Sequence, residues 1–437
     1  MKNLSSSVIA SWLGSSVDVD VSLDGVKVDS RFVEKNDLFV CLLGERVDGH
    51  AYARLALEKG AACLLVDRHL DLDIPQIIVE DTLEALRVIA REYRKTLNAF
   101  FIGITGSNGK TSTKDILHAI LPNSVATYKN QNTEIGTYLN LFRMDSTTEY
   151  GILEFGLDYE GDVALMSSIV EPDAALVMSL APAHMANFNS IEHIASEKFM
   201  IFDSLTNDDL GFYQGDFSLY RALASTQHSF GFDDSNEYVV SDVVLNNVGI
   251  DFKVNGVSYA SNLLGKHQAS NCAGVIALME KMNIDDALIR HGLMNVGLTE
   301  LRTEIVEVGK SLVLLDAYKS NASSTKYALD ILVNYDFDGD KIAVLSDMVE
   351  MGEESLNVHL DVLNELARLD IKHVYTLGYE FNDALGESEL DASKLTNFDS
   401  FEALDAFVQS LFDTKQMILI KGSRSHALEC LIRKEGK

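Results

Sequence analysis

The residues whose types and spacing most clearly suggest chemistry form a glycine-rich turn between an apolar run at 99–105 and the start of a helix. The turn consists of Gly106, Ser107, Asn108, Gly109, Lys110, Thr111 and Ser112. In this order, small residues let backbone N–H groups surround a phosphate chain, the lysine adds a positive charge, and the threonine offers a hydroxyl to Mg²⁺. The spacing departs from the common pattern GxxxxGK[ST], because the first glycine is Gly103 where that pattern requires residue 104. Nucleotide binding is therefore the first hypothesis, and a chance glycine-rich turn is its alternative.

Four further polar side chains lie at the ends of predicted elements in the same part of the chain. Glu154 ends the apolar run ILE, and an acidic group at a strand end beside a phosphate loop is where a Mg²⁺ ligand would lie. His184 follows the next apolar strand, and Lys198 lies on an amphipathic helix. Asn132 belongs to a polar cluster before another helix. Each also has an ordinary interpretation: a solvated carboxylate, a structural histidine, a surface lysine and a capped loop.

Polar clusters also follow three apolar runs in the last third of the chain. Asp316, Tyr318 and Asn321 follow SLVLL, Asp347 follows KIAVLS, and KGSR at 421–424 follows QMILI. Ligands gather at the carboxyl ends of the strands of a parallel sheet. Any one cluster could be only a loop, but their joint occurrence predicts a binding crevice.

The alternation of strands and helices that must position these residues indicates an α/β protein with three domains, at 1–97, 98–298 and 299–437. The first is a small α/β unit with a helix at Tyr52–Lys59. The second is a parallel-sheet domain that opens with the phosphate loop and contains a hairpin-rich region at 210–260, with a turn at Asn255-Gly256. The third is a Rossmann-like, doubly wound domain with four short apolar strands.

Composition excludes several classes of function. The 437 residues carry a formal charge of −30, and such a surface repels nucleic acid and anionic membranes. The four cysteines, Cys41, Cys63, Cys272 and Cys430, form no CxxC pair and are interpreted as small buried apolar residues in a reducing compartment. No apolar run approaches the roughly 18 residues of a membrane span, and the first residues resemble no signal peptide. We expect a cytoplasmic monomer that binds small molecules, with no nucleic acid partner and no membrane insertion.

Taken together, the motifs resemble those of the Mur ligases, the ATP-dependent enzymes that extend the peptide of the peptidoglycan precursor. The resemblance covers nearly the whole chain. In chain order, the matching motifs are VDSR (28–31), DLFVCLLGERVDGH (37–50), GITGSNGKTSTK (103–114), ILEFG (152–156), APAHMANF (181–188), EKFMIF (197–202), GKHQASN (265–271), DAYKSNASS (316–324), DMVEMGEES (347–355) and KGSR (421–424). The family's own phosphate loop explains the one-residue departure at Gly103. DAYKSNASS and DMVEMGEES are most similar to the members that add D-alanyl-D-alanine.

The resemblance implies an activity. The chain would be an ATP-dependent ligase that forms a C–N bond between UDP-N-acetylmuramoyl-tripeptide and D-alanyl-D-alanine through an acyl phosphate. Peptidoglycan synthesis serves cell-wall growth, cell shape and division. The implied cofactors are ATP and Mg²⁺, together with a carbamate formed on Lys198.

The resemblance also implies roles for residues. Lys110 would contact the ATP phosphates, and the metal ligands would be Thr111, Glu154, His184 and the carbamylated Lys198. The nucleotide site would be completed by Asn271, Arg302 and Asp316. The substrate sites would include Ser30, Arg31, Asn132, Tyr318 and Asn321, the first two at the uridine nucleotide.

Two alternatives stay open. A Mur-family ligase that adds a different amino acid would differ around residues 316–325 and 346–355, where Lys319 and Ala322 replace the usual Asn and Pro. A non-catalytic nucleotide-binding paralogue should have lost part of the phosphate loop and the metal ligands, which this sequence retains. The third residue of the acceptor peptide is not determined by the sequence.

Overall fold

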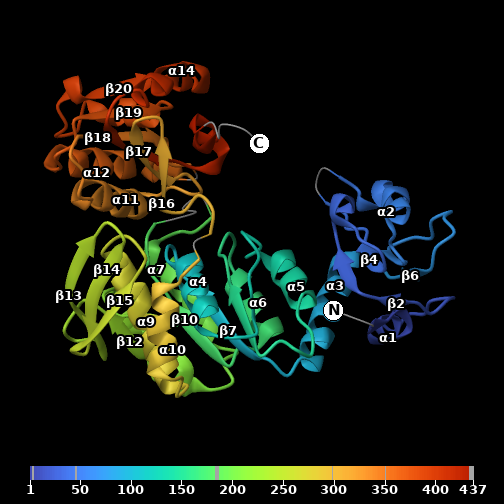
Figure 1. Ribbon diagram of the computed structural model, residues 1–437. Helices are drawn as coiled ribbons and strands as arrows, with labels where there is room; N and C mark the ends of the chain where they lie inside the picture. Colours follow the sequence, from blue (N-terminus) through green and yellow to red (C-terminus); the bar gives the residue numbers. More distant parts are fainter. Residues whose placement is uncertain (2–3, 45–46, 183–186, 298, 350, 433–437) are drawn as a thin grey trace.

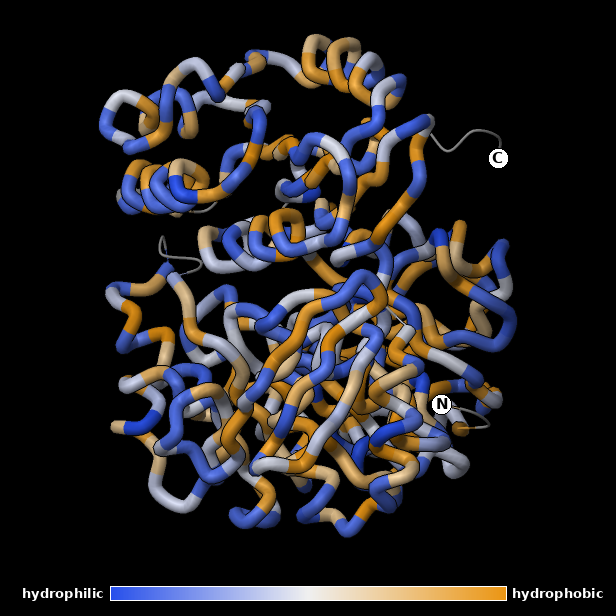
Figure 2. The backbone as a smooth tube through the Cα atoms, turned by 60° about the vertical axis from the view of Figure 1, so that its left-hand side comes forward, coloured by the Kyte–Doolittle hydropathy of each residue, from blue (hydrophilic) through white to orange (hydrophobic). Residues whose placement is uncertain are grey.

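The computed structural model describes residues 1, 4–44, 47–182, 187–297, 299–349 and 351–432. Within these ranges the strands form three larger sheets and one short strand pair. The sheets lie in three blocks: a blue first block beside a central block coloured from teal to yellow, and an orange and red third block above the central one (Figure 1). The apolar residues concentrate in the strands inside the blocks, while the outer loops are mostly polar (Figure 2).

The first block contains a parallel sheet with the strand order β3-β4-β5-β6. Its elements are the strand pair β1 (Leu4–Ser5) and β2 (Ser22–Leu23), the sheet strands β3 (Gly25–Lys27), β4 (Asp37–Val40), β5 (Cys63–Val66) and β6 (Gln76–Ile78), and the helices α1 (Ser6–Trp12) and α2 (Ala53–Lys59). Helix α2 begins one residue later than predicted, because the 3-10 turn Gly49–Tyr52 precedes it.

Helix α3 (Thr82–Thr96) connects the first block to the central one. Asp81 caps its first turn by accepting the N–H groups of Leu83 and Glu84. Its apolar side is buried against α5 (Glu134–Phe142) and α6 (Asp162–Val170) of the central block. The hydroxyl of Tyr93 donates a 2.7 Å hydrogen bond to the carbonyl of Met144. The first and central blocks therefore share one apolar core.

The central block is built on a sheet of nine described strands in the order β15-β14-β13-β12-β11-β10-β7-β9-β8. Their bounds are β7 (Phe100–Thr105), β8 (Ser124–Ala126), β9 (Tyr150–Glu154), β10 (Ala174–Val177), β11 (Gly211–Gln214), β12 (His228–Gly231), β13 (Tyr238–Asn246), β14 (Gly249–Val254) and β15 (Val257–Ser261). The pairs from β8 to β13 are parallel, and β13 to β15 form antiparallel hairpins. The predicted turn Asn255-Gly256 joins the last two strands.

Helices cover both faces of the central sheet. One face carries α4 (Lys110–Ile120), α9 (His267–Lys281) and α10 (Asp286–Met294). The other face carries α5, α6 and α7 (Ile191–Phe199), and α8 (Ser218–Leu223) packs beside α7. Since α4, α6 and α7 begin or end near the carboxyl ends of the parallel strands, their terminal residues meet at one edge of the sheet.

The third block is a doubly wound sheet in the order β16-β17-β21-β18-β19-β20. Its strands are β16 (Glu304–Val308), β17 (Ser311–Asp316), β18 (Asp340–Ser346), β19 (His373–Leu377), β20 (Leu395–Phe398) and β21 (Gln416–Lys421), and its helices are α11 (Ala322–Asn334), α12 (Ser355–Arg368), α13 (Glu380–Leu385) and α14 (Phe401–Leu411). All strand pairs are parallel except β16 with β17. Apolar clusters lie on both faces, one under α11 and α12 and the other under α14.

The predicted α/β fold class is confirmed, with a phosphate-loop sheet in the middle and a Rossmann-like sheet at the end. The strands of each larger sheet fall within one predicted domain, although the boundaries at 97 and 298 stay a prediction. All four cysteines are free thiols, as expected. The expectation that all four are buried was wrong, because Cys430 is exposed. It lies in the 3-10 turn Leu428–Leu431, whose two leucines face the core while the residues between them do not. None of the described helices is long and apolar enough to cross a membrane.

Candidate functional site

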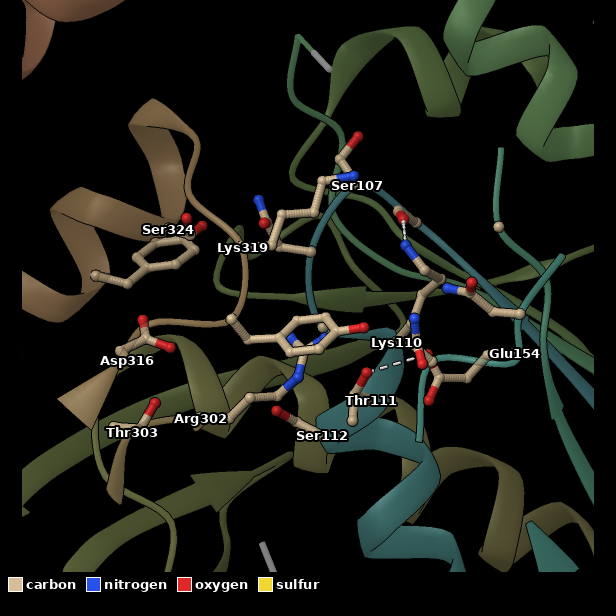
Figure 3. A pocket seen from close by; sticks show the side chains of 18 of the residues that line it. Ser107, Lys110, Thr111, Ser112, Glu154, Arg302, Thr303, Asp316, Lys319 and Ser324 are labelled. Carbon is tan, nitrogen blue, oxygen red and sulfur yellow. Dashed lines mark hydrogen bonds between the residues drawn. The ribbon is translucent and has the colours of Figure 1, made fainter. Parts of the chain in front are cut away.

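A cavity of about 510 Å³ lies between the carboxyl edge of the central sheet and the third block. Its central-block wall is made by the phosphate loop, the end of β9, the end of α7 and the first turn of α9. The opposite wall is made by the segments that follow β17 and β21 and by the start of α11. Figure 3 shows that Lys110, Thr111 and Glu154 face Arg302, Asp316 and Lys319 across this space. The cavity therefore unites segments from two blocks.

The phosphate loop owes its path to two glycines. Gly106 and Gly109 have φ angles of 148° and 89°, which residues other than glycine rarely adopt. A Cβ on Gly109 would also lie 2.7 Å from Oδ1 of Asn271 on α9. Helix α4 then begins at Lys110, and among the described residues no side chain caps its first turn. Its first N–H groups and its positive dipole end are therefore directed at the cavity, an arrangement that binds anions.

Lys110 lies at the floor of the cavity. Its Nζ donates a 2.5 Å hydrogen bond to the carbonyl of Gly106, which holds the ammonium inside the loop. Loss of solvent, together with the positive charge of Lys319, lowers the pKa of Lys110 to about 8, against the opposing effect of Glu154. A phosphate chain in the cavity would further stabilise the charged form of this lysine, because an anion beside an ammonium raises its pKa.

Glu154 and Thr111 form a pair beside the lysine. Glu154 ends β9 with 2% of its surface exposed, and Oγ1 of Thr111 donates to its Oε2 at 3.0 Å. The other oxygen, Oε1, is buried and accepts no hydrogen bond from the described residues; Nζ of Lys114 lies 4.0 Å away. Burial raises the pKa of this carboxyl, although the nearby cations Lys114, Arg302 and Lys110 oppose that effect. A buried carboxylate oxygen without a donor, next to a hydroxyl, fits a hard divalent cation.

Lys198 reaches the same cavity from the last turn of α7. Its exposed fraction is 4%, and burial together with the charges of Lys110 and Lys319 lowers its pKa well below the ordinary value. Within the described part of the chain, no hydrogen bond or ion pair reaches its Nζ. The lowered pKa gives this buried amine a larger neutral, nucleophilic fraction than an exposed lysine has at the same pH.

The third block contributes a second set of charges. The guanidinium of Arg302 lies over the ring of Tyr318, with its carbon 4.6 Å from the ring centroid. Asp316 forms a 3.0 Å ion pair with Lys421, which is 1% exposed and also donates to the carbonyl of Lys319. These contacts fix the orientation of the segment that follows β17.

Two contacts across the cavity join the blocks. The amide of Asn321 donates from Nδ2 to Oδ1 of Asn108 in the phosphate loop at 2.9 Å. Asn321 also caps α11 in a reciprocal capping box with Ser324, so its side chain serves both purposes. The ring of His267, at the start of α9, stacks on Tyr327 of α11 with centroids 4.4 Å apart and an angle of 9°.

Most of the predicted site residues line this one cavity. They are Gly106, Ser107, Asn108, Gly109, Lys110, Thr111, Ser112, Asn132, Glu154, Lys198, Asn271, Arg302, Asp316 and Tyr318. Asn321 contacts the loop directly at Asn108. His184 lies outside the described residues.

The two residues predicted for a uridine nucleotide lie elsewhere. Ser30 and Arg31 belong to the 3-10 turn Ser30–Phe32 of the first block and are not among the described residues that line the cavity. Ser30 is buried, whereas Arg31 pairs with Asp29 at 2.7 Å beside the exposed ring of Phe32. The first block therefore holds a separate candidate surface.

Other residues that line the cavity were not predicted individually from the sequence; among them are His267, Lys319, Tyr327 and Ser423. His267 and Ser423 lie inside the motifs GKHQASN and KGSR, so those motifs contained the signal. Tyr327 lies on the apolar side of a helix and carries no local signal of its own, because its stacking partner is 60 residues away in the chain.

Three family models match successive parts of this chain. They are the Mur ligase family, catalytic domain, over residues 22–94; the Mur ligase middle domain, over 104–279; and the Mur ligase, glutamate ligase domain, over 301–424. The middle-domain match contains the phosphate loop, Glu154 and Lys198. The last match contains Arg302, Asp316 and Lys421.

Individual relatives match over almost their whole length. The UDP-N-acetylmuramoyl-tripeptide--D-alanyl-D-alanine ligase of Bacillus subtilis is 32% identical over 426 residues, which cover 94% of this chain and 93% of that enzyme. The enzyme of the same name from Escherichia coli is 30% identical, with coverages of 95% and 94%. Among solved structures, MurF from Acinetobacter baumannii superposes with a TM-score of 0.87 at 24% identity, covering 97% and 96%. MurF from Thermotoga maritima in complex with ADP gives 0.80 at 24% identity, covering 93% and 96%.

Proposed function

Because this chain belongs to the Mur ligase family, we propose that it joins D-alanyl-D-alanine to UDP-N-acetylmuramoyl-tripeptide in an ATP-dependent reaction of peptidoglycan precursor synthesis. The observation that carries the proposal is the cavity between the central and third blocks. It places a phosphate loop, a buried carboxylate and a buried lysine opposite a second set of cations. A reaction that transfers a phosphoryl group to a carboxylate brings several negative charges together, and this distribution of charge serves it.

The reaction has two steps. A carboxylate oxygen of the tripeptide attacks the γ-phosphorus of ATP, the bond to the β-phosphate oxygen breaks, and ADP leaves. The amine of D-alanyl-D-alanine then attacks the carbonyl carbon of the acyl phosphate, loses a proton, and inorganic phosphate leaves. Lys110 and the first turn of α4 hold the β- and γ-phosphates, while Arg302 approaches from the third block. The walls of both blocks exclude water from the acyl phosphate.

Mg²⁺ fits the donors on the central-block wall. Thr111 and Glu154 would hold one ion, because the buried Oε1 of Glu154 accepts no described hydrogen bond. His184 and a carbamate on Lys198 would provide ligands for a second. When bound, Mg²⁺ neutralises phosphate charge during phosphoryl transfer.

The proposed carbamate on Lys198 has its own test. The neutral amine adds to CO₂ and releases a proton, which converts a group that repels cations into an anionic oxygen ligand. Burial and the low pKa of Lys198 favour the neutral amine that this addition requires. ¹³C NMR of the protein in ¹³C-bicarbonate should show one carbamate resonance that disappears in Lys198→Ala. The control Lys253→Ala, on an exposed hairpin, should keep it, and a resonance that survives in Lys198→Ala would contradict the assignment.

We also propose positions for the substrates along the two walls. Asn271 would approach the adenine from α9, and Asp316 would reach ATP from the end of β17. Asn132, Tyr318 and Asn321 are proposed to face the peptide and the incoming dipeptide. Ser30 and Arg31 in the first block are proposed to hold the uridine nucleotide. A cytoplasmic location and a monomeric state stay predictions.

The deciding experiment measures phosphate release from ATP by the purified protein with Mg²⁺. UDP-N-acetylmuramoyl-tripeptide is supplied with and without D-alanyl-D-alanine. Release that requires both substrates, with a pentapeptide product by mass, is the expected result. Release only with another amino acid or dipeptide would move the activity to a sister ligase, which the unusual Lys319 and Ala322 would then explain. ATP binding without release for any acceptor would indicate a non-catalytic paralogue.

A further inference from the structure

A cluster of one histidine and two glutamates lies beside the cavity and takes no part in the proposed reaction. His193 and Glu197 occupy successive turns of α7, and Glu160 comes from the loop before α6. One ligand atom from each of the three side chains lies within 4.8 Å of the others. Because residues four apart on a helix lie on the same side, α7 alone supplies two of the three donors.

The distances between the donors do not suit direct hydrogen bonds. Nε2 of His193 is 3.8 Å from Oε1 of Glu197 and 4.0 Å from Oε2 of Glu160. Both separations exceed the length of a hydrogen bond. Ligands about 2.1 Å from a shared tetrahedral zinc ion lie roughly 3.4 Å apart. The two separations from His193 exceed this value by about 0.4 and 0.6 Å, and the donor atoms as a set lie within 4.8 Å of one another, so the exposed Glu160 must move inward to enclose such an ion.

Glu197 is the strongest evidence for a ligand. Its side chain is 2% exposed, and its Oε2 accepts a 2.7 Å hydrogen bond from the N–H of Gly161. Its Oε1, directed at His193, accepts no hydrogen bond in the described part of the chain. A buried carboxylate with one oxygen fixed and the other without a donor resembles a metal ligand held by an outer hydrogen bond.

The other two side chains, those of His193 and Glu160, lie on the side of the cluster that is open to solvent. The ring of His193 is fixed edge-on against Phe188, with centroids 5.4 Å apart, and its side chain is 24% exposed. Glu160 is 75% exposed, so it can move toward an ion without disturbing the core. One imidazole and two carboxylates, open on one side, suit Zn²⁺ better than Mg²⁺ or Ca²⁺, which prefer oxygen ligands alone.

The site would be distinct from the proposed nucleotide cavity. None of Glu160, His193 and Glu197 is among the described residues that line the cavity, although Lys198 follows Glu197 directly in the chain and does line it. We propose that Glu160, His193 and Glu197 form a zinc site that ties the start of α6 to α7. This inference stands independently of the ligase activity.

Zinc binding by the whole purified chain tests the proposal. The protein is equilibrated with Zn²⁺ in millimolar Mg²⁺ and dialysed, and the retained zinc is measured by mass spectrometry. Co²⁺ absorption reports on nitrogen ligation. We expect about one retained equivalent in the wild type, loss of the retained zinc in His193→Gln, and affinity at least about tenfold weaker in Glu160→Gln. The Glu160 side chain is mostly exposed, so this second variant should fold even if the first does not.

Two control variants test whether the retained zinc belongs to this cluster. His228 also lies between two acidic residues, but its nitrogens are 2.6 Å from Glu237 and 3.1 Å from Asp209, as in direct hydrogen bonds. His228→Gln should therefore keep the zinc. Glu154→Gln, in which the substituted residue lies in the nucleotide cavity, should also keep the zinc. Zinc that is lost in Glu154→Gln but retained in His193→Gln, or no binding by the wild type, would overturn the proposal.

Discussion

At the scale of single residues, the cavity contains charged groups whose burial is unfavourable until ligands arrive. Glu154 has a buried oxygen without a described donor, and its pKa is raised. Lys110 and Lys198 have lowered pKa values because they have lost solvent and face other cations. Perturbed groups that share one cavity are typical of functional sites.

Glu154→Gln should separate stability from activity. The raised pKa means that the ionised carboxylate destabilises the folded chain at neutral pH, so a neutral amide should increase the free energy of unfolding by about 1 kcal/mol. Phosphate release should fall by at least about 100-fold, since a metal ligand is lost. Thermal unfolding without ligands and the phosphate assay measure the two effects. The exposed control Glu149→Gln should change neither, and a less stable Glu154→Gln would contradict the electrostatic argument.

The local sequence was sufficient to predict those site residues whose role depends on their neighbours in the chain. The glycine and lysine pattern at 106–112 predicted the loop, and its two left-handed glycines explain why the pattern is needed. Tyr327 was not predictable in this way. Its contact with His267 depends on how two blocks are placed, and no local pattern encodes that placement.

At the scale of elements, the segment after β18 is held by a buried histidine. His359 on α12 is fully buried, and its Nε2 accepts the N–H of Met348 at 2.9 Å. Its Nδ1–H donates to the carbonyl of Ser355 at 2.7 Å, as the neutral ring requires. Burial lowers the pKa of His359, which keeps the ring neutral. Val349, which follows Met348 in the chain, lines the cavity.

His359→Leu should therefore affect both folding and the site. The Met348 N–H would lose its acceptor inside the protein, which costs about 1–3 kcal/mol. The segment that carries Val349 should become less ordered, and KM for the amino acceptor should rise more than KM for ATP. Denaturant unfolding and steady-state kinetics measure these effects. His373→Leu, at the first residue of β19, is the control. Equal changes in both KM values would argue against a local role of His359.

The elements predicted best are the strands buried on both faces, such as β7, β10 and β18, because continuous apolar runs indicate them. Among the strands that were not predicted are β8, β16 and β20. These strands are short or half-buried and lie at sheet edges, so their sequences contain no comparable apolar run. Edge position is a property of the whole sheet and is not encoded locally.

At the scale of the whole molecule, three of the contacts that join the described parts of the central and third blocks link residues far apart in the sequence. Two lie at the cavity: Asn108 with Asn321, and His267 with Tyr327. The third lies on the β13–β14 hairpin, where the side-chain amide of Asn247 donates to the carbonyl of Asp336 and accepts its N–H, at 2.9 and 2.8 Å. Contacts on separate sides of the interface restrict rotation of one block against the other.

This interface should weaken in mild acid. Burial lowers the pKa of His267 to about 4 from its ordinary 6.5, so between these values the unfolded chain binds a proton that the folded chain does not. The stability that depends on the neutral ring is therefore present above pH 6.5 and is lost as the pH falls toward 4. From pH 7 to pH 5 this amounts to about 1–2 kcal/mol.

Thermal unfolding of the wild type and His267→Gln at both pH values checks the prediction. The melting temperature of the variant should fall less between pH 7 and pH 5 than that of the wild type. His291→Gln, on the exposed side of α10 and outside the interface, is the control. Parallel curves for wild type and His267→Gln would show that this histidine does not titrate in the expected range.

Helix α3 sets a limit on how this architecture can be divided or recombined. A cut at residue 97 follows the visible outline of the blocks but removes the helix that covers α5 and α6. A shortened chain that begins at residue 98 should therefore aggregate more than one that begins at residue 80, as light scattering of the two fragments would show. For gene fusions, and for exchange of first domains between related enzymes, α3 should therefore be kept together with the central domain that it covers.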